Sequence, residues 1–411
     1  MPFIDAIRLA LSQIRVQKLK SFFTLLGVVI GVMFLIAVVS IVEGMSSYME
    51  HDFVGKLVGV NTVSLKRNGN FEDVSEEEWR AMQRRPRVLI TDVEPVVSAL
   101  PPGTLWSVEG YDNVSMSSRW AKPANLEAWA VDGDYFQIRE MKVSKGRLIT
   151  SQEMALGTPV VVVGEEIAER YFRDLDPIGR ELKVAGLPYT VIGVAESQGS
   201  IFGMSLDRFA IAPYRSPLRH VVNRPQVIDA LKIKLPGDGD MLEAQETIRQ
   251  VMRGRRGLRA SQPDNFALET SESALKFWND IKSKLVIAGV ILPAIGLVVG
   301  AIVIMNIMLV AVAERTREIG IRKALGARRR DIMSQFLVEA ATLSTVGAAI
   351  GIVMGILLAQ FIAAVSPLPA SVAPWSIAAG VIVGAGVGII SGIYPASRAS
   401  RLDPILALRS E

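Results

Sequence analysis

The chain has 411 residues, of which 50% are hydrophobic and 21% are charged. This composition is too apolar for an ordinary soluble enzyme and too charged for a protein made only of membrane helices. The chain has no cysteine, which excludes a disulfide framework and a cysteine-based metal site. The net charge of +4 does not indicate a nucleic-acid partner, because the basic residues form no face interleaved with aromatic side chains.

The hydrophobic residues are concentrated in long runs. A helix needs about 20 apolar residues to cross a hydrocarbon core about 30 Å thick. The runs therefore predict transmembrane helices at residues 21–42, 285–313, 336–365 and 375–394. No small-x-small cleavage site follows the first run, so we expect a retained span and not a signal peptide. The predicted fold class is an α-helical bundle of four transmembrane helices with a large α+β extracytoplasmic domain inserted between the first and the second.

Lysine and arginine are unevenly distributed between the segments outside these runs. They gather in residues 1–20, 314–335 and 395–411, whereas the connector at 366–374 has none. The positive-inside rule therefore places both termini and residues 314–335 in the cytoplasm, and residues 43–284 outside. Apolar residues at helical spacing within residues 1–20 also predict an amphipathic helix along the inner membrane surface.

The region at residues 43–284 is long enough for two compact parts. Separated β–α patterns predict an outer α/β subdomain, a split βαβ arrangement, at about 58–104 and 221–271. The intervening residues, about 105–220, are rich in strand patterns and predict a β-rich inserted subdomain.

Local signals place several elements within this region. Ser75 and Glu78 form a capping box, so a helix is expected to begin after Ser75. In the insertion, the run "TPVVVVG" predicts a buried strand. The stretch "RELKVAGLPYTVIGVAES" predicts a hairpin of two strands around Gly186.

Helical patterns continue beyond the apolar runs on the external side. A single helix from about Glu272 to Ala313 would be about 60 Å long at 1.5 Å per residue, twice the hydrocarbon thickness. Pro293 should kink this helix or be tolerated by neighbouring helices. Glycines at four-residue spacing within the runs predict close helix packing. These predicted packing residues are Gly27, Gly31, Gly296, Gly300, Gly384 and Gly388.

Motifs for catalysis and nucleotide binding are absent from the sequence. It contains no G-x-x-x-x-G-K-[ST] phosphate loop, no H-E-x-x-H zinc motif and no G-x-S-x-G nucleophile motif. Glu339 is the one ionisable residue within a predicted span, which disfavours a proton-driven or ion-driven transporter. We therefore expect no catalytic residue, no cofactor and no metal site in this chain.

The basic connector between the second and third spans has the pattern of two short helical pieces. The first piece should be helical to Leu325, with Gly326 as its C-cap. The second should begin near Ala327, with Asp331 in its first turn. Taken alone, this connector is explained best as a positively charged cytoplasmic anchor.

The wider sequence resembles MacB/FtsX-type ABC transporter permeases, and the MacB-like branch in particular. The resemblance is carried by "ERTREIGIRKALGARRRDI" in the connector and "GIYPASRASRLDPILALRSE" at the C-terminal end. It is also carried by "QKLKSFFTLLGVVIGV" at the first span and "DPIGRELKVAGLPYTVIGV" in the external region. These stretches occur in order and span nearly the whole chain. The resemblance implies four spans, a large external domain and a dimer.

The resemblance also implies a partner subunit. An ABC nucleotide-binding ATPase, which holds ATP and Mg, is expected to dock on the cytoplasmic connector, because this sequence carries no fused ATPase domain. The connector would then be a coupling helix. The expected ATPase-coupling residues are Glu314, Arg315, Glu318, Ile321, Arg322, Lys323, Leu325 and Gly326.

The function implied by the resemblance is mechanotransmission in the bacterial cytoplasmic (inner) membrane. ATP hydrolysis would change the shape of the external domain and drive export of amphiphiles, peptides or lipoproteins. The alternatives are an FtsX-like transmitter that controls a cell-wall hydrolase, and a lipoprotein-release permease. The sequence leaves open the substrate, a homodimer or a heterodimer, and the need for a periplasmic adaptor and an outer-membrane channel. A membrane-anchored external enzyme is the least favoured function.

Overall fold

A computed structural model describes residues 18–50, 61–71, 74–173, 175–201, 203–222, 224–237 and 241–409. The amphipathic helix expected within residues 1–20 therefore lies almost wholly outside the described residues. The chain divides into two compact units. One is a helical unit formed by Met1–Tyr48 and Asp280–Glu411, and the other is an α/β unit formed by Met49–Asn279.

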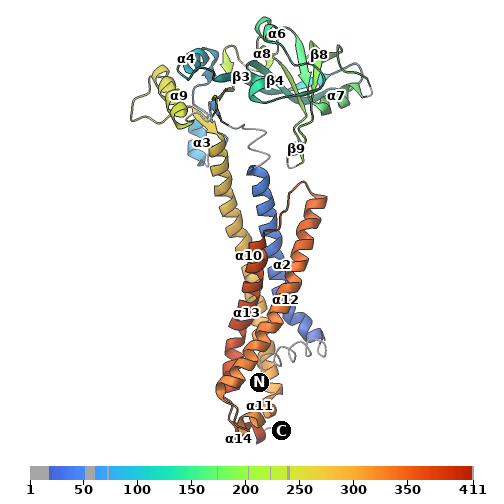
Figure 1. Ribbon diagram of the computed structural model, residues 1–411, viewed down its shortest axis with the longest axis vertical. Helices are drawn as coiled ribbons and strands as arrows, with labels where there is room; N and C mark the ends of the chain where they lie inside the picture. The colour runs from blue at the N-terminus through green and yellow to red at the C-terminus, as the bar shows by residue number, and fades with distance from the viewer. Residues whose placement is uncertain are drawn as a thin grey trace. The chain divides into compact units, whose positions relative to one another are not determined.

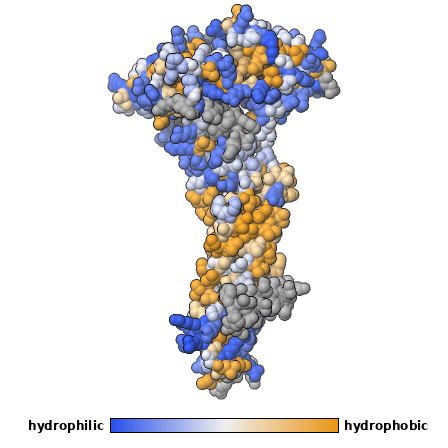
Figure 2. All heavy atoms as spheres, in the orientation of Figure 1, coloured by the Kyte–Doolittle hydropathy of each residue, from blue (hydrophilic) through white to orange (hydrophobic). Residues whose placement is uncertain are grey.

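The helical unit contains four long helices that lie side by side in Figure 1. The described helices are α2 (Lys18–Tyr48), α10 (Ser271–Glu314), α11 (Thr316–Ala324), α12 (Arg329–Val365), α13 (Pro374–Ser400) and α14 (Pro404–Arg409). Within the described residues, α2, α10, α12 and α13 are each long and apolar enough to cross a membrane. Figure 2 shows hydrophobic residues gathered along these helices. The predicted fold class is confirmed, since four such helices occur and the α/β unit lies between the first and the second in the chain.

Helix α10 is one continuous helix of 44 residues, about 66 Å long at 1.5 Å per residue. It begins well before the predicted span at 285–313 and continues through Pro293. It also follows directly on strand β14 (Ala267–Thr270), without a linker. The single long helix expected from the sequence is therefore present, and it belongs in part to each unit.

Glycines allow α2 and α10 to approach closely. A Cβ atom placed on Gly27 would lie 2.5 Å from the Cα atom of Gly300, and one on Gly31 would lie 2.7 Å from Cγ of Leu297. Gly296 has looser surroundings, since its Cβ would lie 3.7 Å from the Cα atom of Gly31. These predicted packing residues thus lie at one helix–helix contact, where a larger side chain would push the backbones apart.

Helices α12 and α13 meet through a second set of small residues. A Cβ atom on Gly384 would collide with Cβ of Ala348, and one on Gly388 would collide with the hydroxyl of Ser344. Gly386, on the same helix, has no atom within 4 Å of such a Cβ. The four-residue spacing therefore identifies the packed stripe of α13, and the glycine outside that stripe faces open space.

The α/β unit contains short helices and many strands. Its strands are β1 (Thr62–Lys66), β2 (Val88–Leu89), β3 (Leu105–Ser117), β4 (Ala124–Gly133), β5 (Val143–Gly146), β6 (Val160–Val163), β7 (Glu181–Val184), β8 (Leu187–Ala195), β9 (Ser200–Ile201), β10 (Met204–Ser205), β11 (Phe209–Pro213), β12 (Val227–Ile228), β13 (Ala230–Lys234) and β14. Its helices are α3 (Glu76–Met82), the 3-10 helix η2 (Ile90–Asp92), α4 (Val93–Ser98), α5 (Tyr135–Ile138), α6 (Ser151–Leu156), α7 (Glu165–Phe172), α8 (Arg219–Val222) and α9 (Met241–Arg255).

The local predictions for this unit are confirmed. The Glu78 N–H donates to Ser75 Oγ at 3.4 Å and the Ser75 N–H donates to Glu78 Oε2 at 2.8 Å, which caps α3. Strand β6 is fully buried, and β7 pairs with β8 in an antiparallel hairpin that turns at Gly186.

The described strands form one large sheet in the order β14-β1-β13-β3-β4-β11-β6-β8-β5, and β7 pairs with both β3 and β8. Strand β1 is antiparallel to β13 and β14, so β13, α9 and β14 form a split βαβ unit with β1 between its strands. Strand β3 of the expected insertion pairs directly with β13. The predicted division at residue 105 therefore does not separate two sheets, because long-range pairing joins both parts.

The two faces of this sheet differ in chemistry. Helices α4, α7 and α9 cover an apolar face, in line with a core that includes Val63, Leu65, Val108, Leu231 and Ile233. Successive side chains along a strand point to opposite faces, so the residues next to these core residues lie on the second face of the sheet. Along β1, β3, β13 and β14 this second face is polar and carries, all of them buried, Ser64, Ser107, Glu109, Lys232 and Glu269. Across β4, β6 and β11 the same face is apolar, with a second cluster that includes Val131, Val162 and Ile211.

Candidate ATPase-coupling site

Helix α11 is stabilised by its own termini. Glu318 lies in the first turn and Arg322 in the last turn, where each charge is favoured by the helix dipole. Gly326 follows with φ of +97°, a conformation that glycine adopts without strain. The Gly326 N–H donates to the Lys323 carbonyl, and the Ala327 N–H donates to the Arg322 carbonyl, each at 3.1 Å. These two bonds form a Schellman motif, so the predicted C-cap is confirmed.

Helix α12 begins two residues after the position expected from the sequence. Its N-cap is Arg328, and the Arg328 N–H donates to Asp331 Oδ2 at 2.9 Å. The carboxylate of Asp331 thus satisfies a backbone donor that the first turn leaves free. The turn between α11 and α12 is therefore short and fixed at both ends by local hydrogen bonds.

Arg315 lies just before α11 and points to α12. Its guanidinium lies 3.3 Å from Oε1 of Glu339, whose side chain is only 4% exposed. A buried carboxylate needs such a cation, because an uncompensated charge away from water costs several kcal/mol. Glu339 is thus the partner of a predicted coupling residue, a contact that the sequence did not reveal.

Two further predicted coupling residues are held by the chain itself. Arg322 donates to Gln335 Oε1 at 2.9 Å and also pairs with Glu318. The Lys323 ammonium donates to the Leu402 carbonyl at 2.7 Å. These cations brace α11 against α12 and the C-terminal segment, so their hydrogen-bonding capacity is partly used within the chain.

The C-terminal helix α14 packs on α11. A Cβ atom on Gly320 would lie 2.8 Å from Cβ of Ala407, so the absence of a side chain at Gly320 allows this contact. The Ile405 N–H donates to Asp403 Oδ1 at 2.8 Å at the start of α14. The sequence predicts a cytoplasmic tail at residues 395–411 and does not place a separate helix there. The dipeptide Asp403-Pro404 was the available signal for a helix start there.

Some of the predicted coupling residues are exposed, and together they are here named the elbow surface. They are Glu314, Glu318, Ile321, Leu325 and Gly326. Leu325 is 83% exposed and Ile321 is 44% exposed, although this end of the helical unit is rich in charge. Exposed apolar side chains with a polar rim are typical of protein–protein contacts.

Family comparisons agree with this architecture. Residues 21–251 match the family model described as MacB-like periplasmic core domain, and residues 290–404 match the one described as FtsX-like permease C-terminal. The chain belongs to the MacB/FtsX-type family of ABC transporter permeases. In this MacB-like permease, α11, its turn and α12 all lie within the FtsX-like match.

Curated relatives extend the likeness along the whole chain. A macrolide export ATP-binding/permease protein MacB from Neisseria meningitidis is 28% identical over 412 residues, covering 100% of this chain and 61% of the relative. The protein of the same name from Hahella chejuensis is 31% identical over 417 residues, covering 100% of this chain and 60% of the relative. The MacB-like permease therefore spans about 61% of the length of the relatives it matches.

Two solved structures are similar to about half of the chain. The periplasmic region of MacB from Actinobacillus actinomycetemcomitans is 16% identical with a TM-score of 0.44, covering 54% of this chain and 94% of that chain. The extracellular domain of the noncanonic ABC-type transporter YknZ from Gram-positive bacteria is 15% identical with a TM-score of 0.41, covering 51% of this chain and 100% of that chain.

Proposed function

We propose that this permease is the membrane subunit of an ABC transporter, and that a nucleotide-binding ATPase docks on its elbow surface. The observation that carries the proposal is the exposure of Leu325 and Ile321, 83% and 44%, on a short and internally braced helix. An apolar side chain that protrudes into water gains free energy when a partner covers it. The ATPase would hold ATP and Mg, and the curated relatives are named as ATP-binding proteins as well as permeases.

The bracing of α11 supports a mechanical role. Arg315 pairs with Glu339 of α12, and Lys323 binds the Leu402 carbonyl before α14. A force applied to the elbow surface would therefore move α11 together with its neighbours. Helix α10 then runs without interruption to Ser271, directly after β14 of the α/β unit. This continuity supports mechanotransmission from the ATPase to the external domain.

The proposed outcome is export of amphiphiles, peptides or lipoproteins from the outer side of the membrane. Glu339, the one ionisable residue in a predicted span, is paired with Arg315. The described helices thus offer no line of free ionisable groups such as ion pathways use. A permease that works by moving its external domain does not need a row of ionisable groups across the membrane. This observation therefore supports mechanotransmission over proton-coupled transport.

Substitution of Leu325 by glutamate tests the docking. The variant Leu325→Glu places a charge where the ATPase would cover an apolar side chain, which costs about tenfold or more in affinity. We expect the ATPase that co-purifies with the permease in mild detergent to be lost, together with stimulated ATP hydrolysis. Leu156→Glu is the matched control, because Leu156 is 73% exposed on α6 of the α/β unit.

Equal ATPase capture by Leu325→Glu and by the parent chain would contradict the docking assignment. Charge reversal at Arg322 and Lys323 is a less direct test. It would break the hydrogen bonds to Gln335 and to the Leu402 carbonyl and so disturb the bracing as well.

A further inference from the structure

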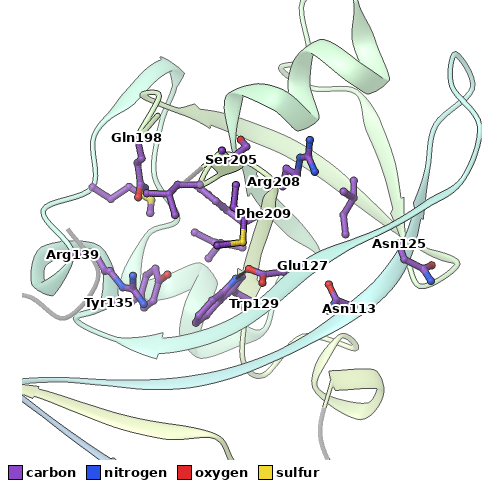
Figure 3. A pocket seen from close by; sticks show the side chains of 16 residues that line it. Asn113, Asn125, Glu127, Trp129, Tyr135, Arg139, Gln198, Ser205, Arg208 and Phe209 are labelled. Carbon is purple, nitrogen blue, oxygen red and sulfur yellow. Dashed lines mark hydrogen bonds between the residues drawn. The ribbon is translucent and has the colours of Figure 1, made fainter. Parts of the chain in front are cut away.

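A pocket lies on the second face of the sheet in the α/β unit, where residues of the apolar cluster such as Phe209 and Ile211 line it. Its volume is about 520 Å³, within the range of small-molecule sites. Strands β4 and β11, Gln198 and residues from the stretch 203–208 line it (Figure 3). Asn113 lies four residues after Glu109 along β3 and therefore on the same face of the sheet.

Aromatic side chains form the floor of the pocket, and strand pairing holds them in place. Trp129 stacks on Tyr111 of the neighbouring strand, with ring centroids 4.8 Å apart. These two residues are register partners in the β3–β4 pair, so backbone pairing holds the stack in place. Phe209 and Tyr135 add further aromatic surface. Such a floor suits the flat or apolar body of a ligand.

The opposite wall is also preformed. Figure 3 shows Gln198 and Ser205 across the pocket from Trp129. Asp207 anchors this wall, because its buried carboxylate accepts hydrogen bonds from Ser197 Oγ at 2.6 Å and from the Gln198 N–H at 2.8 Å. A carboxylate so occupied is not available to a ligand, but it keeps the wall in position.

The charges of the lining leave one carboxylate uncompensated. Arg139 pairs with Glu109 at 3.6 Å, and its guanidinium carbon lies 5.5 Å from the centroid of the Trp129 ring, so it already covers part of that ring. Arg208 pairs with Glu166 at 2.6 Å. Glu127 is exposed, and no cation forms a salt bridge with it among the described residues. Its Oε2 accepts a hydrogen bond from the indole N–H of Trp129 at 3.3 Å, which holds the carboxylate beside the aromatic floor.

We propose that this pocket binds an organic cation carried on an apolar body. The cation would pair with the Glu127 carboxylate, and the apolar body would lie on Trp129 and Phe209. An anionic ligand would meet a negative charge at Glu127, and a neutral ligand would gain nothing from it. The inference goes beyond ATPase docking, because every group it uses lies within the α/β unit.

Two related dyes provide the test. Rhodamine 6G is a cation, whereas rhodamine B shares its aromatic body but carries a carboxylate and has no net charge. Binding of each to the full chain in zwitterionic lipid nanodiscs is measured by fluorescence polarisation. We expect the parent chain to prefer rhodamine 6G by about tenfold, the size of a partly desolvated cation–carboxylate or cation–π contact.

The variant Glu127→Gln removes the charge and keeps the shape, so it should abolish this preference. Glu127→Lys should abolish binding of rhodamine 6G. Glu181→Gln, at an exposed carboxylate on β7, is the matched control and should bind like the parent chain. Thermal unfolding checks that each variant is folded. Leu325→Glu should bind the dye normally, which separates a failure of ATPase docking from a failure of the pocket.

The proposal is overturned if Glu127→Gln binds rhodamine 6G as tightly as the parent chain does. It is equally overturned if the parent chain binds rhodamine B as tightly as rhodamine 6G, since partition into lipid or an uncharged site would then explain the signal.

Discussion

The buried Lys232 on the second face of the sheet makes the stability of the α/β unit depend on pH. Lys232 is only 5% exposed and lies opposite Ser64 and Ser107 in the sheet. Burial, with a smaller contribution from the charge of Arg139, lowers the pKa of Lys232 to about 8. In the unfolded chain the same group keeps its proton to a higher pH. Between these two pKa values the unfolded state binds more protons, so folding becomes more favourable as pH rises.

Replacement of Lys232 isolates this effect. From pH 7.5 to pH 9.5 the parent chain should gain about 1–2 kcal/mol of stability relative to Lys232→Met, in which no proton is released. Thermal unfolding of both proteins at the two pH values measures the difference. Parallel pH profiles would show that Lys232 titrates normally in the folded state.

Residues with local partners were predictable from the sequence, and residues with distant partners were not. The caps at Ser75 and Gly326 depend on neighbours within a few positions, so a single stretch of sequence reveals them. The partner of Arg315 is Glu339, on a different helix, and nothing in the sequence around Arg315 indicates it. The coupling role of residues 314–326 stays a prediction, and their division into braced and exposed residues required the structure.

At the scale of elements, helix packing followed from the spacing of small residues. Gly384 lies against Ala348 of α12, whereas Gly386 faces open space on the same helix. The sheet was less predictable, because β3 pairs with β13 across more than a hundred residues of intervening chain. Strand patterns identify each strand but not its neighbour, so the continuous sheet could not be read from the sequence.

The two glycines of α13 provide a matched pair of substitutions. Gly384→Leu should destabilise the helical unit by about 1–3 kcal/mol, because overpacking forces two backbones apart. Gly386→Leu should be neutral or slightly stabilising, since it only raises helix propensity. Thermal unfolding in one detergent compares them. Equal losses of stability would mean that α12 and α13 do not pack through this stripe.

At the scale of the whole molecule, the orientation of the chain remains a prediction from its charges. The chain has no native cysteine, so a single introduced thiol reports on one position only. A membrane-impermeant maleimide added outside spheroplasts with an intact inner membrane should label Leu156→Cys in the α/β unit and leave Leu325→Cys unlabelled. Labelling of Leu325→Cys under those conditions would reverse the predicted topology.

The same cysteine-free background gives the most direct test of ATPase docking on the elbow surface. A short bifunctional cross-linker is applied to native membranes that contain Leu325→Cys, and the cross-linked partner is identified by mass spectrometry. The proposal predicts one dominant product, a nucleotide-binding ATPase, and no such product from Leu156→Cys. A product that lacks any ATPase, obtained from membranes in which the permease is folded, would contradict it.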